Sequence, residues 1–410
     1  MRDSPWNRTL DRRSFVVGLG CLGTGLRGPR VLLERGARTS EGAQRSLVVL
    51  QLSGGNDGLS TVVPYADDAY HAARPTLRLG VEDGLRLDDY RAFHSALERL
   101  HQRFQEGKLA VVEGVGYPHP NRSHFKSMEI WHTADPRGRA AGDGWIGRTC
   151  AAAFGADVEP HRLVHVGPNA PYSVHSSEHP AATFSVPEAY RWLQEGQELA
   201  RIEAGEREAG AGSSLAFLRE RMRDVRDSSA SIRAAVARYR TPVEYPRGAF
   251  GESLRIAAAL LAGEVGTRVV SLELGGFDTH NDQRNRHEAC LRTLDEGLGA
   301  FLDDLERSEA GRAALVLVFS EFGRRVDENG SRGTDHGCAG PAFLAGASVL
   351  GGVYGEHPSL VDLGEGDLVH TTDFRSVYAT AIEATFPVEH STVLGARFPL
   401  LACAAALKRR

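Results

Sequence analysis

Carboxylate and imidazole side chains, which hold Zn²⁺, Mn²⁺ and similar ions in proteins, recur in this chain directly after apolar runs. The residues in this setting are Asp57, Asp278, His280, Asp335 and His336. Two ions held close together by such ligands activate a nucleophile and stabilise a leaving oxygen in phosphoryl-type transfers. The pattern therefore predicts a site for one or two metal ions. The competing interpretation is that each group is a polar turn with a surface histidine.

The elements that must position these residues are mainly apolar runs at 47–52, 269–274 and 315–319. Such runs are typical of strands that are buried on both faces of a parallel sheet. Segments with helical periodicity alternate with them, at 93–104, 254–261, 283–306 and 371–386. We therefore predict an α/β fold: a doubly wound, mostly parallel sheet with helices on both faces. In such sheets ligands bind beyond the carboxyl ends of the strands.

A further helix is predicted from about residue 121 to residue 132, with Asn121 or Ser123 as its N-cap. Its amino terminus would face the same sheet edge, which favours a bound anion. His124 at its start suits an acid, a base or a structural histidine. Arg324 and Arg325 follow the run at 315–319, where a guanidinium would bind an anionic substrate through paired hydrogen bonds. An ion pair with Glu321 or Asp327 explains such an arginine equally well.

Residues 1–45 have the features of an export signal and linker. Paired arginines at Arg12 and Arg13 precede a short apolar run at 16–26, which is too short to span a bilayer. The pairing favours the twin-arginine route, so the translocase is an expected partner and the periplasm, cell envelope or exterior the expected location. The competing interpretation is a disordered tail.

The charge of the remaining chain argues against nucleic acid as a partner. The net charge is −5 overall, and the first 45 residues hold nine basic and four acidic residues. The rest therefore has 39 basic and 49 acidic residues, a net charge of −10. Nucleic-acid-binding domains are usually basic, because they neutralise phosphates. A small anionic substrate stays compatible with this charge, since local positive charge outweighs the net value.

We expect one α/β domain over 46–405, with a helical insertion at about 187–245. Within the insertion, apolar residues three and four apart predict a long helix at 213–240. Its apolar seam packs on the main domain or, in the second interpretation, forms a homodimer contact.

The order of motifs resembles the alkaline phosphatase and sulfatase superfamily and, within it, the exported family called domain of unknown function 1501. The resemblance rests on the twin-arginine leader and on Leu52–Leu59, Asn121–Phe125, Gly276–His280, Ser320–Arg325, Gly333–Gly337 and Thr372–Arg375. It covers nearly all of the chain from about residue 46. It implies an alkaline-phosphatase-like core that binds one or two divalent ions, Zn²⁺ or Mn²⁺ above all.

The resemblance also implies roles for the metal-ligating residues. Asp57 looks like the first-strand ligand of one ion, which Asp335 and His336 share. Asp278 and His280 resemble ligands of a second ion, although the superfamily commonly spaces that Asp and His four apart and here they are two apart. The other residues that the resemblance leaves as candidates are His287 for the second ion, and His357 or His370 for a downstream ligand.

The superfamily's nucleophile lies at the start of the helix after the second strand, where Ser123 is the only hydroxyl or thiol. A serine there, beside a metal ion, would attack a phosphorus or sulfur centre. The competing interpretation is that Ser123 only caps the helix. The Cys/Ser-x-Pro-x-Arg signature of formylglycine sulfatases is absent, so ordinary sulfatase chemistry is disfavoured.

The preferred hypothesis is an exported, metal-dependent hydrolase of a phosphate or related ester, with a small anionic ester or an envelope glycan or polymer as its substrate. The first alternative is a catalytically silent member of the fold that binds or assembles other molecules at the envelope. The second is an enzyme with one metal ion or none that uses His124 or His280 as its base.

Overall fold

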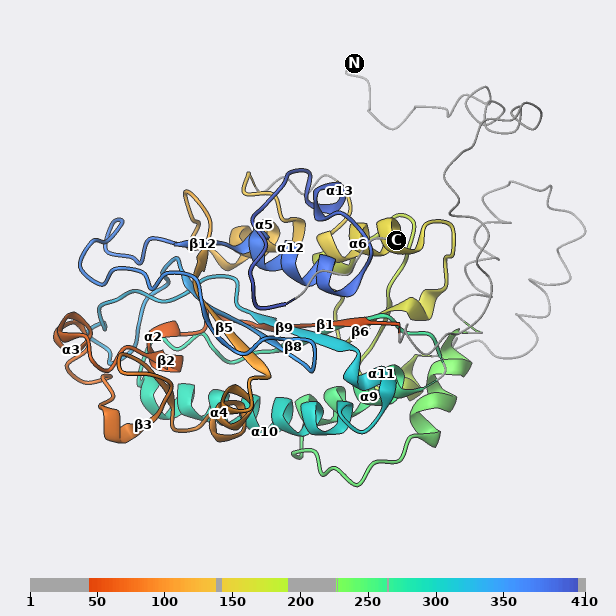
Figure 1. Cartoon of the computed structure of the whole chain (residues 1–410), viewed down its shortest axis with the longest axis horizontal. Coiled ribbons are helices and arrows are strands. Elements are labelled where there is room, and N and C mark those ends of the chain that lie inside the picture. Colours follow the sequence, from red (N-terminus) through yellow and green to blue (C-terminus); the bar gives the residue numbers. More distant parts are fainter. Residues whose placement is uncertain (1–43, 138–141, 191–225, 227, 264, 405–410) are drawn as a thin grey trace, which may run out of the picture. The chain divides into compact units, whose positions relative to one another are not determined.

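The computed structural model of the protein describes residues 44–137, 142–190, 226, 228–263 and 265–404. In this part of the chain the main sheet has the strand order β11-β5-β10-β9-β1-β8-β6-β7, and β12 pairs with β5 (Figure 1). The strand bounds are β1 Ser46–Leu52, β5 Leu109–Gly116, β6 Leu163–Val166, β7 Ala182–Phe184, β8 Val269–Leu274, β9 Ala314–Phe319, β10 Gly340–Ala345, β11 Gly352–Tyr354 and β12 Thr372–Asp373.

The sheet is mixed but mostly parallel. Among the described strands of this main sheet, only β10 runs antiparallel to its neighbours, β5 and β9. The pairs around the centre, β9 with β1 and β1 with β8, are parallel. The predicted doubly wound, mostly parallel α/β sheet is therefore confirmed.

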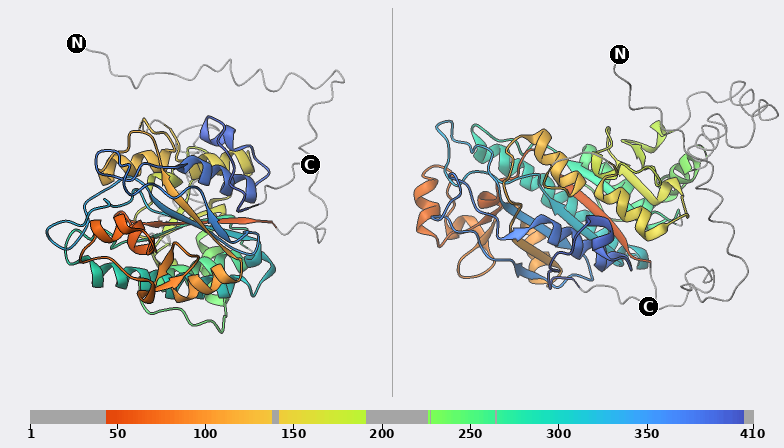
Figure 2. Two further views of the ribbon diagram at one scale, coloured as in Figure 1. Left: turned by 60° about the vertical axis from the view of Figure 1, so that its left-hand side comes forward. Right: turned by 90° about the horizontal axis from the view of Figure 1, so that it is seen from above.

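Helices cover both faces of the sheet. In Figures 1 and 2 one layer holds α5, α6, α12 and α13, and the opposite layer holds α4, α9, α10 and α11. The helix bounds are α2 Gly58–Thr61, α3 Asp68–Ala73, α4 Glu98–Gln105, α5 His124–Thr133, α6 Trp145–Phe154, α9 Ala249–Ala262, α10 Gln283–Leu305, α11 Glu309–Arg312, α12 Phe374–Thr385 and α13 His390–Leu394. Short 3-10 turns lie at Val81–Asp83, Pro160–Arg162, Tyr172–Val174 and Pro187–Ala189.

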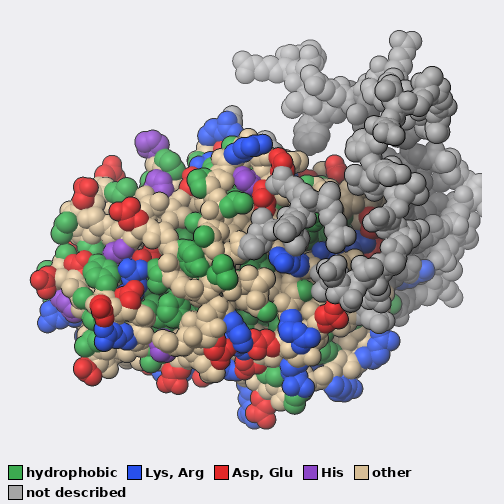
Figure 3. Space-filling view, viewed as in Figure 1, with side chains coloured by type: hydrophobic (Ala, Val, Ile, Leu, Met, Phe, Trp, Pro, Cys, Tyr) green, Lys and Arg blue, Asp and Glu red, His purple; other side chains and the backbone are tan. Residues whose placement is uncertain are grey.

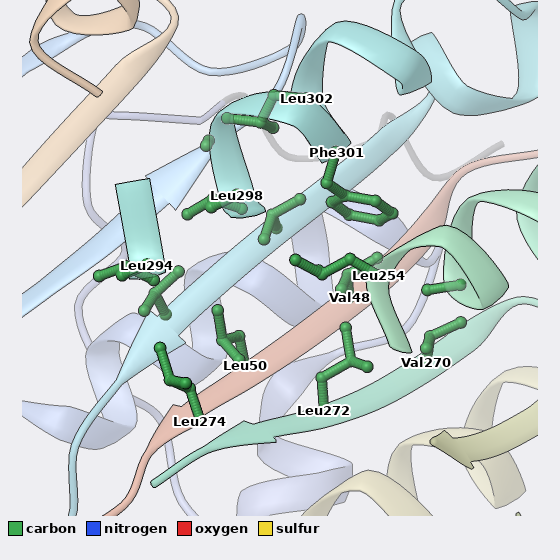
Figure 4. Close-up of a cluster of buried hydrophobic side chains, with 14 of the residues drawn as sticks. Val48, Leu50, Leu254, Val270, Leu272, Leu274, Leu294, Leu298, Phe301 and Leu302 are labelled. Atoms are coloured by element: carbon green, nitrogen blue, oxygen red, sulfur yellow. The ribbon is translucent and has the colours of Figure 1, made fainter. Parts of the chain in front are cut away.

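The alternating side chains of β1 explain why the strand is apolar throughout. Val48 and Leu50 pack into the cluster beneath α9 and α10, which Figure 4 shows. Leu47 and Val49 point the other way, into the cluster beneath α5 and α12. Since successive side chains of a strand face opposite sides, a strand between two helical layers must be apolar at nearly every position.

The predicted helix at 93–104 is partly wrong. Residues Ala92–His94 form β4 of a small second sheet, ordered β2-β4-β3, and α4 begins only at Glu98. The other two strands of that sheet are β2 Val62–Val63 and β3 Gly84–Arg86. The predicted burial of Phe93 holds although the residue lies in a strand, because it packs into the same core cluster as Leu100 of α4. The apolar spacing alone therefore did not separate a strand from a helix.

Much of the predicted leader and insertion lies outside the described residues, including 1–43, 191–225 and 227. Residues 228–238 are helical, which agrees with the carboxyl-terminal part of the predicted long helix. Ile232 and Val236 from its apolar seam are buried in the core cluster with α9. These two residues therefore pack on the main domain and are not available to a homodimer contact.

On the face that Figure 3 shows, Lys and Arg side chains are interspersed with Asp and Glu and do not gather into one basic surface. None of the helices in the described part of the chain has the length and apolar character of a membrane-spanning segment.

Burial of His132 in α5 predicts a loss of stability in mild acid. Its Nε2 lies 2.8 Å from Gln51 Oε1, and burial lowers its pKa to about 4. The unfolded chain therefore takes up a proton near pH 6.5 while the folded protein does not, so stability falls as the pH drops from 6.5 towards 4. At pH 5 we expect His132 to contribute about 2 kcal/mol of destabilisation relative to pH 7.

The measurement is urea unfolding of wild type and His132→Gln at both pH values. The variant should lose less stability between pH 7 and pH 5 than wild type, and His119→Gln, a change of an exposed residue, should behave like wild type. An equal pH dependence in all three proteins would contradict the prediction.

Candidate metal centre

The carboxyl ends of β9, β1 and β8 meet at one edge of the sheet because the three strands are adjacent and parallel. The loop after β1 lies directly against the loop after β8. Gly54 has a φ of +118°, and a Cβ at this position would lie 2.4 Å from the backbone nitrogen of Asp278. Only glycine permits this close approach, so the sequence Ser53-Gly54-Gly55 serves to bring the two loops into contact.

Four polar side chains from these loops and from α5 come together at this edge. One donor atom each of His124, Asp278 and His336 lies within 4.8 Å of the others. His280 adjoins this group, because its Nε2 is 2.9 Å from His336 Nε2 and 3.1 Å from Asp278 Oδ1. His124 begins α5, Asp278 and His280 follow β8, and His336 follows β9, so three distant segments contribute to one group.

The hydrogen bond of His336 assigns its tautomer. Its Nδ1 lies 2.8 Å from the main-chain oxygen of Arg122, which only accepts, so Nδ1 carries the proton. The lone pair of the neutral ring is then on Nε2, which lies 3.0 Å from Asp278 Oδ1. Burial lowers the pKa of His336 below its ordinary value, which favours the neutral ring.

The other two histidines are oriented in the same way. His124 Nδ1 is 2.9 Å from Glu321 Oε1, and His280 Nδ1 is 3.3 Å from Asp335 Oδ1. A carboxylate on Nδ1 fixes the proton there and directs the Nε2 lone pair forward. Three imidazoles thus present Nε2 towards the same carboxylate, Asp278.

This donor set fits a divalent metal ion. Lone pairs that face one another and a carboxylate at about 3 Å repel unless a cation or a proton lies among them. Neutral imidazole Nε2 atoms and a carboxylate oxygen are the ligands of zinc and related ions, and outer carboxylates on Nδ1 are the usual support. The residues His124, Asp278 and His336, with His280 beside them, are therefore suited to hold one ion.

Asp278 is the shared member of the group and is kept ionised. Burial acts to raise its pKa, but the hydrogen bond and the positive charge of Arg324 act to lower it, and the pKa of Asp278 lies below its ordinary value. Its side chain is 49% exposed, so an ion or a substrate reaches it from solvent.

Arg324 has a different place from the predicted anion clamp. It is buried and donates to main-chain oxygens, from Nε to Gly55 at 2.8 Å and from Nη1 to Thr334 at 2.7 Å. Its Nη2 donates to Asp278 Oδ1 at 2.7 Å. Because the guanidinium is used within the protein, Arg324 positions Asp278 and the surrounding loops and does not reach a substrate.

Asp57 is not brought to the group either. Its side chain is fully buried, and Arg74 donates to both of its oxygens, Nη1 to Oδ2 at 2.6 Å and Nη2 to Oδ1 at 2.9 Å. Burial acts to raise the pKa of Asp57, but the pairing with Arg74 outweighs it and holds the pKa well below the usual range. A carboxylate neutralised in this way does not fit the predicted role of metal ligand.

The remaining predicted ligands also fall in separate places. Asp335 supports His280 through Nδ1 and does not face Asp278. His357 contacts Glu113, with its Nδ1 3.0 Å from Oε1. His287 is buried beside Asn56, and His370 packs against Gly116 of β5.

Ser123 occupies the N-cap position of α5 but does not cap it, since its side chain makes no cap hydrogen bond. Its own backbone N–H donates to Asn121 Oδ1 at 2.9 Å, so Asn121 shapes the turn before the helix. The Ser123 side chain is exposed next to His124 and has no hydrogen-bond partner among the described residues.

Sequence reasoning missed Glu321 and Arg122 as supports of the histidines. Glu321 is fully buried and its Oε1 accepts from both His124 Nδ1 and the Gly54 backbone N–H at 2.8 Å. The available signal was a charged residue two positions beyond the apolar run at 315–319. The main-chain oxygen of Arg122 left no such signal, because any residue carries one.

Comparison with known families gives one match. A family model described as "Protein of unknown function (DUF1501)" matches residues 110–384. The chain belongs to the DUF1501 family. The matched residues of this DUF1501 protein include all four members of the candidate metal centre, and Asp57 lies outside them. No curated protein matches the sequence.

Several solved structures resemble the fold. The C-terminal periplasmic domain of EcEptC from Escherichia coli has a TM-score of 0.38 at 10% identity, over 75% of this chain and 74% of that one. A protein in the alkaline phosphatase superfamily from Vibrio parahaemolyticus has a TM-score of 0.36 at 11% identity, over 88% and 67%. The PsFucS1 sulfatase from Pseudoalteromonas sp. has a TM-score of 0.36 at 10% identity, over 77% and 65%.

The support of His124 by Glu321 predicts the effect of Glu321→Gln. The amide still accepts from the Gly54 N–H, so the fold should persist, but it does not fix the His124 tautomer as a carboxylate does. We expect Zn²⁺ affinity to fall by about 10- to 100-fold, measured by competition with a chromogenic chelator. Glu288→Gln, which removes a surface pair with Arg292, is the matched control. Equal affinities in both variants would contradict the role of Glu321.

Proposed function

We propose that this DUF1501 protein is an exported, metal-dependent hydrolase of a phosphate or related ester. The observation that carries the proposal is the convergence of three histidine Nε2 atoms on Asp278, each with Nδ1 held by an acceptor. A structural cluster has no need of three imidazoles whose lone pairs face one carboxylate. The same group is open to solvent through the half-exposed side chain of Asp278.

A divalent ion, Zn²⁺ or Mn²⁺, held by His124, Asp278 and His336 would supply positive charge that polarises an anionic ester. Glu321 and Asp335 keep the protons of His124 and His280 on Nδ1, and Arg324 keeps Asp278 ionised and in place. These contacts preorganise the group before a substrate arrives, which lowers the cost of reorganisation during the reaction.

Two arginines beside the group are suited to bind the anionic part of a substrate. Arg122 and Arg325 share one buried carboxylate, that of Asp367, and their side chains are 34% and 36% exposed. Arg122 also lies 3.7 Å from Glu365 Oε2, but that side chain is 89% exposed, so an anionic substrate would replace this loose second partner. Arg122 also adjoins the group directly, because its main-chain oxygen holds His336. Of the two arginines that the sequence suggested for substrate binding, we assign that role to Arg325, because the guanidinium of Arg324 is used within the protein.

Ser123 is the proposed nucleophile. Its exposed side chain precedes His124, and the uncapped amino terminus of α5 favours negative charge on a nearby oxygen. Attack by Ser123 Oγ would displace the alcohol of the ester and leave a covalent phosphoryl-serine, which water then hydrolyses.

The second candidate function is a catalytically silent protein that binds other molecules at the cell envelope. The pairing of Asp57 with Arg74 favours it, because that pairing removes one carboxylate that a two-metal site would use. In that case protons, not a metal ion, lie among the three histidines. The bound molecule in either case, a substrate or a ligand, is a small anionic ester or an envelope glycan or polymer, and export through the twin-arginine translocase stays part of the proposal.

Metal content separates the two functions. We expect one equivalent of a transition metal in protein purified without chelator, loss of that metal in Asp278→Asn, and hydrolysis of a phosphomonoester, phosphodiester or sulfate ester by wild type alone. Arg292→Gln on the surface of α10 should keep both properties. A wild-type protein that neither contains nor takes up metal would overturn the hydrolase proposal and support the binding protein.

Ser123→Ala separates attack by serine from attack by water. If Ser123 is the nucleophile, the variant should keep its bound metal and lose at least 100-fold in kcat, because no covalent intermediate forms. Mass spectrometry after acid quench should show the phosphoryl adduct in wild type and not in the variant. Undiminished turnover in Ser123→Ala would assign the attack to water.

A further inference from the structure

The guanidinium of Arg74 is enclosed by oxygen atoms. Arg74 ends α3 and is fully buried. Its Nη1 donates to Asp57 Oδ2 at 2.6 Å and Ser60 Oγ at 3.1 Å, and its Nη2 donates to Asp57 Oδ1 and the Arg325 main-chain oxygen, both at 2.9 Å. Its Nε donates to the Val326 main-chain oxygen at 2.9 Å. A guanidinium has five N–H donors, and all five are used.

The five acceptors form a cage that suits a cation in general. Two carboxylate oxygens, one hydroxyl and two main-chain oxygens are the ligand types that hard cations such as Ca²⁺ take. Asp57 also accepts from Gln283 Nε2, so the cage is held from α10 as well. An ionised carboxylate buried this deeply requires a positive partner, and removal of that partner is strongly destabilising.

The cage lies beneath the candidate metal centre and connects its loops. Arg74 donates hydrogen bonds to the main-chain oxygens of Arg325 and Val326. These two residues directly follow Arg324, whose guanidinium donates to Asp278. Gln283 Oε1 accepts from Thr279 Oγ1 at 3.1 Å and Thr334 Oγ1 at 2.6 Å. Thr279 lies between Asp278 and His280, and Thr334 precedes Asp335 and His336. The Asp57–Arg74 ion pair is therefore linked by hydrogen bonds to the segments that carry Asp278, His280 and His336 of the candidate metal centre.

We propose that Arg74 is a built-in cation that fills the place a second metal ion would take at Asp57, so that the centre above it holds one ion only. The statement that the centre holds one ion rests on the proposed metal centre. The statement that Arg74 occupies a cation site at Asp57 does not. Removing the side chain of Arg74 should leave an all-oxygen site that accepts Ca²⁺ or free guanidinium.

The test is Arg74→Gly in the full chain. We expect its urea midpoint to fall by roughly 1 M and to recover in 5 mM guanidinium chloride, far below denaturing concentrations, or in millimolar Ca²⁺. Calorimetry should show one equivalent of Ca²⁺ bound by Arg74→Gly and none by wild type. Arg78→Gly, a change of an exposed arginine four residues away, should show no response to either cation.

If Arg74→Gly does not fold unaided, it is refolded with and without each cation, and recovery of folded protein in their presence alone supports the proposal. Asp57→Asn/Arg74→Gln, in which both charges are absent, should fold without a cation and bind none. Failure of both cations to restore Arg74→Gly would overturn the cage.

A Co²⁺ titration of wild type, followed by visible absorption, tests the connection to the centre. One equivalent is expected in wild type, with a spectrum that changes in Arg74→Gly and returns with guanidinium. Two equivalents in wild type would overturn the single-ion centre. Absence of any Co²⁺ binding would remove the proposed hydrolase while the Ca²⁺ and guanidinium results still decide the role of Arg74.

Discussion

The parallel pairing of β9, β1 and β8 is the constraint on which the rest of the structure depends. It places three strand ends at one edge, so that segments more than 200 residues apart in sequence become neighbours. The approach is close because Gly54 has no side chain, and a Cβ there would collide with the backbone at Asp278. The positions of the polar side chains of the candidate metal centre depend on this contact between the two loops.

Three buried charges convert that edge into a defined site. Glu321, Arg324 and Arg74 are each buried, and each is satisfied by main-chain groups as well as by a side chain of opposite charge or an imidazole. A buried charge with one missing partner costs several kcal/mol, so such groups tolerate few geometries. Glu321 fixes His124, Arg324 fixes Asp278, and Arg74 fixes Asp57 and the loop after Arg324. The rigidity of the exposed group therefore comes from the ionic layer beneath it.

This layered arrangement explains why only one ion is proposed. The histidines present Nε2 atoms towards Asp278, and imidazole nitrogen suits a borderline metal such as zinc. The oxygens around Asp57 suit a hard cation, and a guanidinium already satisfies them. The two proposed cation positions thus differ in chemistry: the side chain of Arg74 occupies one, and the other, at Asp278, is open to solvent.

The sequence by itself determined the fold class and the place of the site. Apolar runs such as 47–52 are forced by burial between two helical layers, and polar groups that follow such runs must gather at the strand ends. The sequence therefore predicted the neighbourhood of Asp278, His280, Asp335 and His336.

Tertiary structure decided which of them face one another. Asp57 and His357 have the same side-chain chemistry as the ligands, yet Asp57 is bound by Arg74 and His357 by Glu113. Partners 17 and 244 positions apart are fixed by packing and buried charge, which local spacing does not encode.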